Sequence, residues 1–378
     1  MISPKQFCDV LNGQGLNHFY GVPDSLLKNL CAYIDNSFGS DFHVITANEG
    51  NAVGLAAGHY IGSAQPAVVY MQNSGLGNAV NPLTSLADPA VYSIPMLLII
   101  GWRGEPGVKD EPQHIKQGKI TEQQLEVLGI PYVVIDAFSS LEHSLLPLLS
   151  KMHECSCPVA ILVRKDTFAD EGKVAASHSQ YPMSREQVLA SLVERTTGDE
   201  LIISTTGMTS RELYEIRQAN NQKNTDFLTV GAMGHTLSIA MGVARVNPNR
   251  TVIALDGDGS MLMHMGSLAV VGASNLENLI HVVLNNQCHD SVGGQPTIAG
   301  AIDLERIVLG CGYKAYFRCE DATSLNAVWS QVLKDKVKFN GPVLFEVKIK
   351  KGARSDLGRP TSTPKENKVA FMQHASGE

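Results

Sequence analysis

The sequence predicts an α/β protein with two doubly wound parallel-sheet domains. Short apolar runs alternate with helical patterns, which is typical of parallel strands covered by helices on both faces. This alternation occurs twice, and a polar segment without an apolar period separates the two blocks. A chain of 378 residues is long enough for two such domains, each with a core of its own.

The first block contains uninterrupted apolar runs that are short enough for buried strands. Strands are expected over His43–Ala47, Ala67–Met71, Met96–Ile100, Tyr132–Ile135 and Val159–Val163. Helices are expected over Pro4–Asn12, Asp24–Asp35, Asn51–Ile61, Gly77–Leu86, Thr121–Leu128 and Ser140–Cys155. The first domain is therefore expected to span residues 1–168.

The second block repeats the pattern over residues 183–378. Its strands are expected over Leu201–Ser204, Thr251–Leu255, Leu279–Leu284 and Val343–Val347. Residues 169–182 mix polar and small side chains and are expected to form a linker. The stretch Lys350–Glu378 is expected to be irregular apart from a short helix near Glu366–Gln373, with a disordered tail as the alternative.

Composition argues against several classes of function. The chain has 30 Lys and Arg against 37 Asp and Glu, a net charge of -7, which disfavours nucleic-acid binding through phosphate contacts. Its longest apolar stretch, Ile94–Ile100, is far shorter than the roughly 20 residues of a membrane span. The first residues lack an apolar signal core, so a cytoplasmic location is expected. The 7 cysteines include no CxxC pair and are expected to be mainly buried apolar residues.

Polar side chains end two strands of the second block. Gly257, Asp258, Gly259 and Ser260 follow one strand, and Asn286 follows the next. Because neighbouring strand ends meet at one edge of a parallel sheet, the Asp258 carboxylate and the Asn286 carbonyl can bind one cation. Oxygen ligands of this kind suit Mg²⁺, which commonly bridges protein carboxylates to phosphates. Either turn alone has a second explanation, because DG and NN often simply end strands.

This combination of GDG and NN resembles the signature of the thiamin-diphosphate-dependent enzymes. The resemblance implies that Asp258 and Asn286 bind Mg²⁺ through their side chains and Cys288 through its backbone carbonyl. It also implies that Met233 lies beneath the cofactor and that the Gly231 carbonyl accepts a hydrogen bond from it. A further diphosphate-binding turn is expected at Thr205, Thr206 and Gly207.

The family also requires a carboxylate in the pyrimidine-binding (PYR) domain, and Glu49 occupies the matching position after the strand His43–Ala47. A proton shared between Glu49 and the pyrimidine ring would activate the cofactor. The alternative is that Glu49 only caps the following helix. In the family the PYR domain and the diphosphate-binding (PP) domain meet across a subunit boundary, so a homo-oligomer is expected. The short linker leaves no room for the middle domain of many relatives.

Four longer segments resemble the phosphonopyruvate decarboxylases, with the sulfopyruvate decarboxylases close by. They are Gly21–Leu27, Gly101–His114, Asn286–Gln295 and, as the fourth, Leu357–Thr361 with Glu366–Lys368. The resemblance implies decarboxylation of 3-phosphonopyruvate to phosphonoacetaldehyde and CO2, as a step of phosphonate biosynthesis. Decarboxylation of sulfopyruvate or another 2-oxo acid, carboligation, and a regulatory protein without turnover remain alternatives.

A substrate with a carboxylate and a phosphonate needs local hydrogen-bond donors and positive charge. The candidates for substrate binding are Asn73, Ser74, Arg103, Lys109 and His114, while Lys116 lies in the same basic segment. Asp24 resembles the acidic residue that related decarboxylases place beside the departing carboxylate or the carbanion, and His289 and Asp290 are candidate proton donors for the enamine. The alternative for each of these residues is an ordinary position on the solvated surface or in the core.

Overall fold

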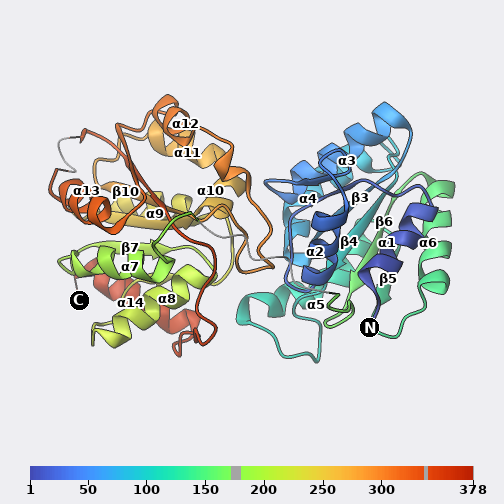
Figure 1. The fold of residues 1–378 in the computed structure, drawn as a ribbon, viewed down its shortest axis with the longest axis horizontal. Helices are drawn as coiled ribbons and strands as arrows, with labels where there is room; N and C mark the ends of the chain where they lie inside the picture. Colours follow the sequence, from blue (N-terminus) through green and yellow to red (C-terminus); the bar gives the residue numbers. More distant parts are fainter. Residues whose placement is uncertain (172–179, 336–338, 378) are drawn as a thin grey trace. The chain divides into compact units, whose positions relative to one another are not determined.

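The computed structural model describes residues 1–171, 180–335 and 339–377. The chain divides into two compact units, Met1–Ala176 and Ser177–Glu378 (Figure 1). Each unit contains one six-stranded sheet in which all neighbouring strands run parallel. Most of the expected linker, residues 172–179, lies outside the described residues. Among the described residues, no helix combines the length and the apolar character needed to cross a membrane.

In unit 1, helices follow most of the strands. Its elements are α1 (Pro4–Gly13), β1 (Phe19–Gly21), α2 (Lys28–Ser37), β2 (His43–Ile45), α3 (Glu49–Ser63), β3 (Ala67–Gln72), η1 (Asn73–Gly75), α4 (Leu76–Pro82), η2 (Leu83–Ala87), β4 (Met96–Gly101), α5 (Pro112–Val127), β5 (Tyr132–Ile135), α6 (Leu141–Cys155) and β6 (Pro158–Val163). The strand order is β2-β1-β3-β4-β6-β5. After β1 the chain continues to β2 on one side of the sheet, and after β3 it continues to β4 on the other side, so the order reverses between β1 and β3.

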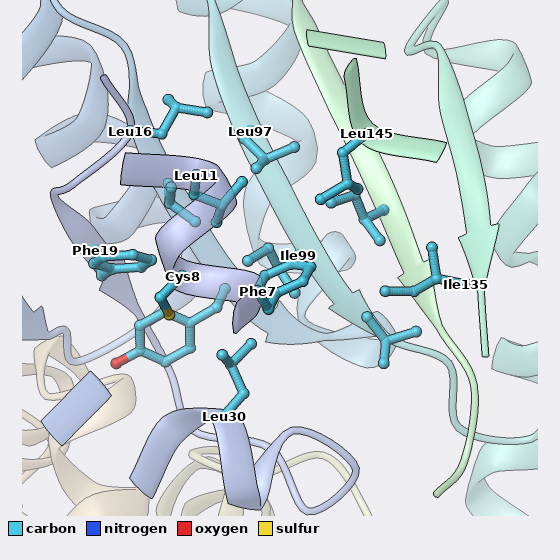
Figure 2. Close-up of a cluster of buried hydrophobic side chains, with 14 of the residues drawn as sticks. Phe7, Cys8, Leu11, Leu16, Phe19, Leu30, Leu97, Ile99, Ile135 and Leu145 are labelled. Atoms are coloured by element: carbon cyan, nitrogen blue, oxygen red, sulfur yellow. The ribbon is translucent and has the colours of Figure 1, made fainter. Parts of the chain in front are cut away.

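Both faces of this sheet are buried because successive strand residues point to opposite sides. In β4, Leu97 and Ile99 contact the core formed with α1, α2 and α6, whereas Leu98 and Ile100 contact the core formed with α3 and α4. Figure 2 shows the first of these cores, where Phe7 of α1 lies close to Ile99. Two helical layers therefore hold the strand ends of unit 1 in place.

Unit 2 has the same layered arrangement. Its elements are α7 (Arg185–Glu194), β7 (Leu201–Ser204), α8 (Met208–Ala219), β8 (Phe227–Leu228), α9 (Thr236–Val246), β9 (Val252–Gly257), α10 (Asp258–Met263), α11 (Gly266–Gly272), β10 (Leu279–Asn285), η3 (Ile298–Gly300), α12 (Leu304–Gly310), β11 (Ala315–Cys319), α13 (Ala322–Asp335), β12 (Val343–Lys348) and α14 (Pro364–Ser376). The strand order is β11-β12-β10-β9-β7-β8, which reverses direction between β7 and β9. One core packs against α7, α8 and α13, and the other against α9 to α12 and α14.

The C-terminal stretch contains more regular structure than the sequence suggested. Helix α14 covers Pro364–Ser376, and it begins with a capping box in which Thr363 and Glu366 each satisfy the other's backbone N–H. Asn367 accepts a hydrogen bond from the N–H of Leu228, and Phe371 is buried in the core of unit 2. These contacts extend the helix beyond the short segment that was expected.

Three strands escaped the sequence analysis: β1, β8 and β11. Two of them, β8 and β11, are edge strands with partly exposed side chains, so their sequences lack a continuous apolar run. Helix α2 begins at Lys28 rather than at Asp24, because Asp24 lies in a turn where its carboxylate accepts the N–H of Leu26. The strands β3, β4, β9, β10 and β12 match their predicted ranges within two residues.

Candidate active site

A cavity of unit 2 lies where the strand order reverses, beyond the carboxyl ends of β7 and β9. Open α/β sheets bind ligands at such points. The backbone N–H of Thr205 donates to Leu255, and its hydroxyl donates to Ser260, at 2.8 and 3.1 Å. The predicted residues that line this cavity are Thr205, Thr206, Met233, Gly257, Asp258, Gly259, Ser260, Asn286, Cys288, His289 and Asp290. Most of the predicted diphosphate and metal residues are therefore brought together by the fold of this one unit.

Asp258 occupies the first position of α10 and is almost fully buried. Burial raises its pKa to about 6, while a hydrogen bond from the Thr297 hydroxyl to Oδ2 and another from the Asn286 N–H favour the charged form. A nearby cation stabilises the charged form of a buried carboxylate whose pKa is raised. Asp258 is thus a suitable ligand for a divalent metal.

The loop after β10 provides the other predicted metal ligands. Asn286 is buried, and its Oδ1 accepts the backbone N–H of Cys288 at 3.0 Å. Burial raises the pKa of the Cys288 thiol, and Asp290 raises it further, so the side chain stays neutral. Among the described residues, no group of three or more His, Cys, Asp and Glu side chains is arranged to hold a metal. Oxygen from Asn286 and from a backbone carbonyl would therefore have to complement the single carboxylate of Asp258.

The start of α8 has features that suit an anion. This helix of 12 residues begins at Met208 without a side-chain cap, and Thr206, Met208 and Thr209 line the cavity. Gly207, which precedes the helix, has a φ of 92° that L side chains rarely adopt. Unpaired N–H groups at a helix start attract phosphate groups. Gly207 itself lies next to Ser291, another lining residue.

Of the remaining predicted residues of unit 2, some line the cavity and one does not. Met233 is half-buried and lines the cavity, directly after Ala232, whose φ is 52°. Gly231 is not among the residues that line the cavity. Burial lowers the pKa of His289 to about 4, so this imidazole is neutral at pH 7. The His289 ring also lies close to Gly259: a Cβ added at Gly259 would be 3.0 Å from it. A side chain at Gly259 would therefore displace His289.

Glu49 is the first residue of α3 in unit 1 and is 5% exposed. Asn48 caps this helix by accepting the N–H of Asn51, so Glu49 itself is not the cap. Burial raises the pKa of Glu49, although the amide of Asn78 donates to Oε2 at 2.7 Å and partly offsets this effect. A buried carboxyl group with a raised pKa, outside the cap position, suits proton sharing with a ligand.

Asp24 is fully buried at the point where the sheet of unit 1 reverses. Its Oδ1 accepts a hydrogen bond from Gln72 at 2.7 Å, and its Oδ2 accepts the N–H of Leu26 at 2.9 Å. Burial raises its pKa, while these hydrogen bonds and the charge of Arg103 act in the opposite direction. Ser74 joins this group by donating to Gln72. Asp24, Ser74 and Arg103 are thus close together, although they lie far apart in the sequence.

The basic candidates of unit 1 are used in different ways. Arg103 forms a two-pronged ion pair with Asp110, and its Nη1 donates to Ser25 at 2.7 Å. The Asn73 amide is completely buried and donates to the carbonyl of Arg103 and to Thr121. The NH2 group of Asn73 is therefore already used in hydrogen bonds that hold the loop carrying Arg103. A substrate could accept a hydrogen bond from this NH2 group only by replacing one of them.

The other two basic candidates differ in their exposure. Burial lowers the pKa of His114 to about 4, so His114 is neutral at pH 7. Lys109 is exposed in the loop before α5, close in sequence to Asp110. His114 therefore adds no positive charge to this edge of unit 1 at pH 7.

Several residues near the predicted site residues were not predicted, and three of them contact a predicted residue or line the cavity with a charged group. Asn78 contacts Glu49, Thr297 contacts Asp258, and the Arg185 guanidinium lines the cavity of unit 2. None carries a local sequence signal, because each reaches its partner through a turn or helix distant in the chain. A pairing of Asn78 with Glu49, for example, depends on how α3 packs against α4.

Two family descriptions match the chain, one for each unit. Residues 4–126 match "Thiamine pyrophosphate enzyme, N-terminal TPP binding domain" and residues 203–347 match "Thiamine pyrophosphate enzyme, C-terminal TPP binding domain". The ranges include Glu49 in the first match and the Asp258 and Asn286 pair in the second.

Curated relatives extend the similarity over nearly the whole chain. The phosphonopyruvate decarboxylase of Streptomyces viridochromogenes is 37% identical, over 97% of this chain and 93% of that protein. That of Streptomyces hygroscopicus is 34% identical, over 100% of this chain and 94% of the relative. The sulfopyruvate decarboxylase of Methanosarcina acetivorans is 27% identical, over 82% and 83%. The chain therefore belongs to the thiamine pyrophosphate enzymes and, within them, to the phosphonopyruvate decarboxylase family.

Proposed function

We propose that the chain decarboxylates 3-phosphonopyruvate to phosphonoacetaldehyde and CO2, using thiamin diphosphate and Mg²⁺. One observation carries the proposal: a chain similar over nearly its full length to two phosphonopyruvate decarboxylases contains both Glu49 and the Asp258 and Asn286 pair. The sulfopyruvate decarboxylase relative is less similar and covers less of the chain, which favours the phosphonate substrate.

The cavity of unit 2 fits the diphosphate end of this cofactor. The uncapped start of α8 suits its phosphate oxygens, and the hydroxyls of Thr205 and Ser260 add polar groups to the cavity. Asp258 and Asn286 supply two oxygen ligands for Mg²⁺, with the Cys288 carbonyl as a third. Met233, half-buried beside them, would support the ring system.

When bound, thiamin diphosphate supplies the electron sink for decarboxylation of a 2-oxo acid. Glu49 would hold a proton at its carboxyl oxygen and share it with a ring nitrogen of the cofactor. Its raised pKa supports this role, because a group that exchanges protons near neutral pH works best with a pKa close to that pH.

The substrate carries several negative charges, so its site needs positive charge and hydrogen-bond donors. We assign Arg103 and Lys109 to the charged end of the substrate, with Ser74 as an additional donor. His114 contributes only as a neutral imidazole, and Asn73 acts through the Arg103 loop that it supports. Asp24 lies in the same group, where its buried carboxyl can hold a proton near the reacting carbon.

We also propose that the functional form is a homo-oligomer, in which Glu49 of one subunit serves the cavity of another. The resemblance to the family supports this arrangement, and size-exclusion chromatography with light scattering would measure the mass. A monomeric enzyme with full activity would contradict it.

Initial rates of CO2 release from phosphonopyruvate, sulfopyruvate and pyruvate test the proposed reaction. We expect rapid turnover of phosphonopyruvate alone, and loss of turnover when thiamin diphosphate or Mg²⁺ is omitted. Glu49→Gln should bind the cofactor but lose most of the rate, because Gln cannot hold the proton. Faster turnover of sulfopyruvate would contradict the substrate, and normal turnover by Glu49→Gln would contradict the proton-sharing role.

A further inference from the structure

Four hydrogen-bond donors converge on the carboxylate of Asp290. The Asn286 amide nitrogen lies 2.6 Å from Oδ2, and Nη1 of Arg185 lies 3.2 Å from the same oxygen. The Cys288 thiol donates to Oδ1 at 3.3 Å, and the N–H of Gly352 lies 3.0 Å from it. With four donors around it, Asp290 is best described as an acceptor that joins separate segments of unit 2.

These contacts determine which way the Asn286 amide points. A carboxylate only accepts hydrogen bonds, so the atom of Asn286 that faces Asp290 must be the nitrogen. The N–H of Cys288 only donates, and it faces Oδ1 of the same amide. The two neighbours therefore agree on one orientation, in which the oxygen that a hard cation prefers is on the side away from Asp290.

Asp290 is itself held by a buried ion pair. Arg185, at the start of α7, binds both oxygens of Glu212 on α8, at 2.9 and 3.2 Å. The side chains of Arg185 and Glu212 are 7% and 2% exposed. Because this pair is fixed on two packed helices, its contact with Asp290 restrains the carboxylate in the folded protein.

The preceding residue, Asn285, is held in the same way. Its amide nitrogen donates to Glu346 at 2.6 Å, and its Oδ1 accepts the N–H of Gln287 at 3.1 Å. Glu346 is buried and also binds Lys348, at 2.8 Å, and the hydroxyl of Tyr316. Both asparagines of the NN pair thus have their nitrogen bound by a carboxylate and their oxygen bound by a backbone N–H of the next turn.

We propose that Asp290 is a positioning residue for the divalent cation: it holds the Asn286 amide so that Oδ1 is offered to the metal in the cavity that Asp258 also lines. The inference rests on the proposed Mg²⁺ site and changes the role expected for Asp290, which was proton donation. Groups behind metal ligands commonly contribute about 10- to 100-fold to metal affinity.

Asp290→Asn removes the carboxylate with little change in shape. Asn has one acceptor oxygen, and its NH2 group would face donors such as Arg185, so the Asn286 amide loses its fixed orientation. The measurement is calorimetric titration of Mg²⁺ into protein saturated with thiamin diphosphate, alongside kcat at saturating Mg²⁺. We expect the apparent Kd for Mg²⁺ to rise about 10- to 100-fold, with kcat and its pH profile close to those of the wild type.

Two further variants separate the possible outcomes. Asp290→Glu keeps the carboxylate and should restore much of the affinity, whereas Asp303→Asn, an exposed helix cap in the same unit, should leave it unchanged. If Asp290→Asn does not fold, Arg185→Gln, which releases one restraint on Asp290, should weaken Mg²⁺ binding to a smaller extent. Unchanged Mg²⁺ affinity in the folded variants, or loss of kcat with unchanged affinity, would overturn the proposal.

The titration does not depend on the reaction. Wild-type protein that binds Mg²⁺ with thiamin diphosphate but does not decarboxylate phosphonopyruvate would contradict the proposed function and leave the role of Asp290 testable. Conversely, an active enzyme whose Asp290→Asn variant binds Mg²⁺ normally would contradict the role of Asp290 alone.

Discussion

Gly75 lies directly against the side chain of Glu49, so Gly75→Ala should displace the carboxyl group that we assign to proton sharing. A Cβ added at Gly75 would lie 2.4 Å from Oε1 and 2.5 Å from both Cδ and Cγ of Glu49. Because carbon atoms in contact are separated by about 3.5–4 Å, the side chain must move by roughly 1 Å. A shift of this size in a catalytic group can lower the rate by about 100-fold, which corresponds to about 2.7 kcal/mol.

The assay is the initial rate of CO2 release at saturating phosphonopyruvate, thiamin diphosphate and Mg²⁺. Gly77→Ala is the matched control, because a Cβ at Gly77 meets no atom within 4 Å and this residue is exposed on α4. We expect normal kcat for Gly77→Ala and a stability gain of about 0.5–1 kcal/mol from replacing a helical glycine. Wild-type kcat in Gly75→Ala, with cofactor bound, would refute the requirement for Glu49 at its present position.

Three further predictions concern stability, each measured by denaturant unfolding of the apoprotein. Burial raises the pKa of Glu49 above its ordinary value of 4.5, so its contribution to stability is fully present below pH 4.5 and is lost as the pH rises through the folded-state pKa. Glu49→Gln should therefore gain stability relative to the wild type between pH 5 and pH 8, and a constant difference would contradict this. Phe371→Ala should cost about 3–5 kcal/mol by leaving a cavity under α14, and a loss below 1 kcal/mol would show that α14 is not held by this residue. Arg217→Met should cost about 3–5 kcal/mol because it leaves the buried Asp226 without its ion pair, and Arg217→Met with Asp226→Leu should recover part of the loss; no recovery would mean that other contacts of Arg217 dominate.

Apolar runs predicted the interior strands well because both faces of a parallel sheet are buried. The runs Met96–Ile100 and Leu279–Leu284 correspond to β4 and β10, where every residue is buried. The edge strand β11 failed this criterion, since Arg318 is exposed and the three residues before it are only partly buried. Edge strands depend on pairing with a neighbour, which no local pattern in the sequence reports.

For the candidate site, the local motifs predicted which residues end the strands. Most of the predicted PP-domain residues line one cavity of unit 2, because the motif residues follow β7, β9 and β10, whose carboxyl ends point the same way. The role of Asp290 could not be predicted in the same way. The hydrogen-bond donors to Asp290 come from the loop after β10, from α7 and from the segment after β12. Their convergence therefore depends on packing between elements distant in the sequence.

The sequence by itself determined the class of the fold, the family, and the residue types available for a diphosphate, a divalent cation and a shared proton. Its strand-ending motifs contain this information because hydrophobic periodicity and turn residues act locally. The tertiary structure decided the state of each group: Glu49 is buried beside Asn78, Arg103 is paired with Asp110, and the Asn286 amide has one orientation. These properties follow from burial and from hydrogen bonds between distant segments, and such interactions exist only once the chain has folded.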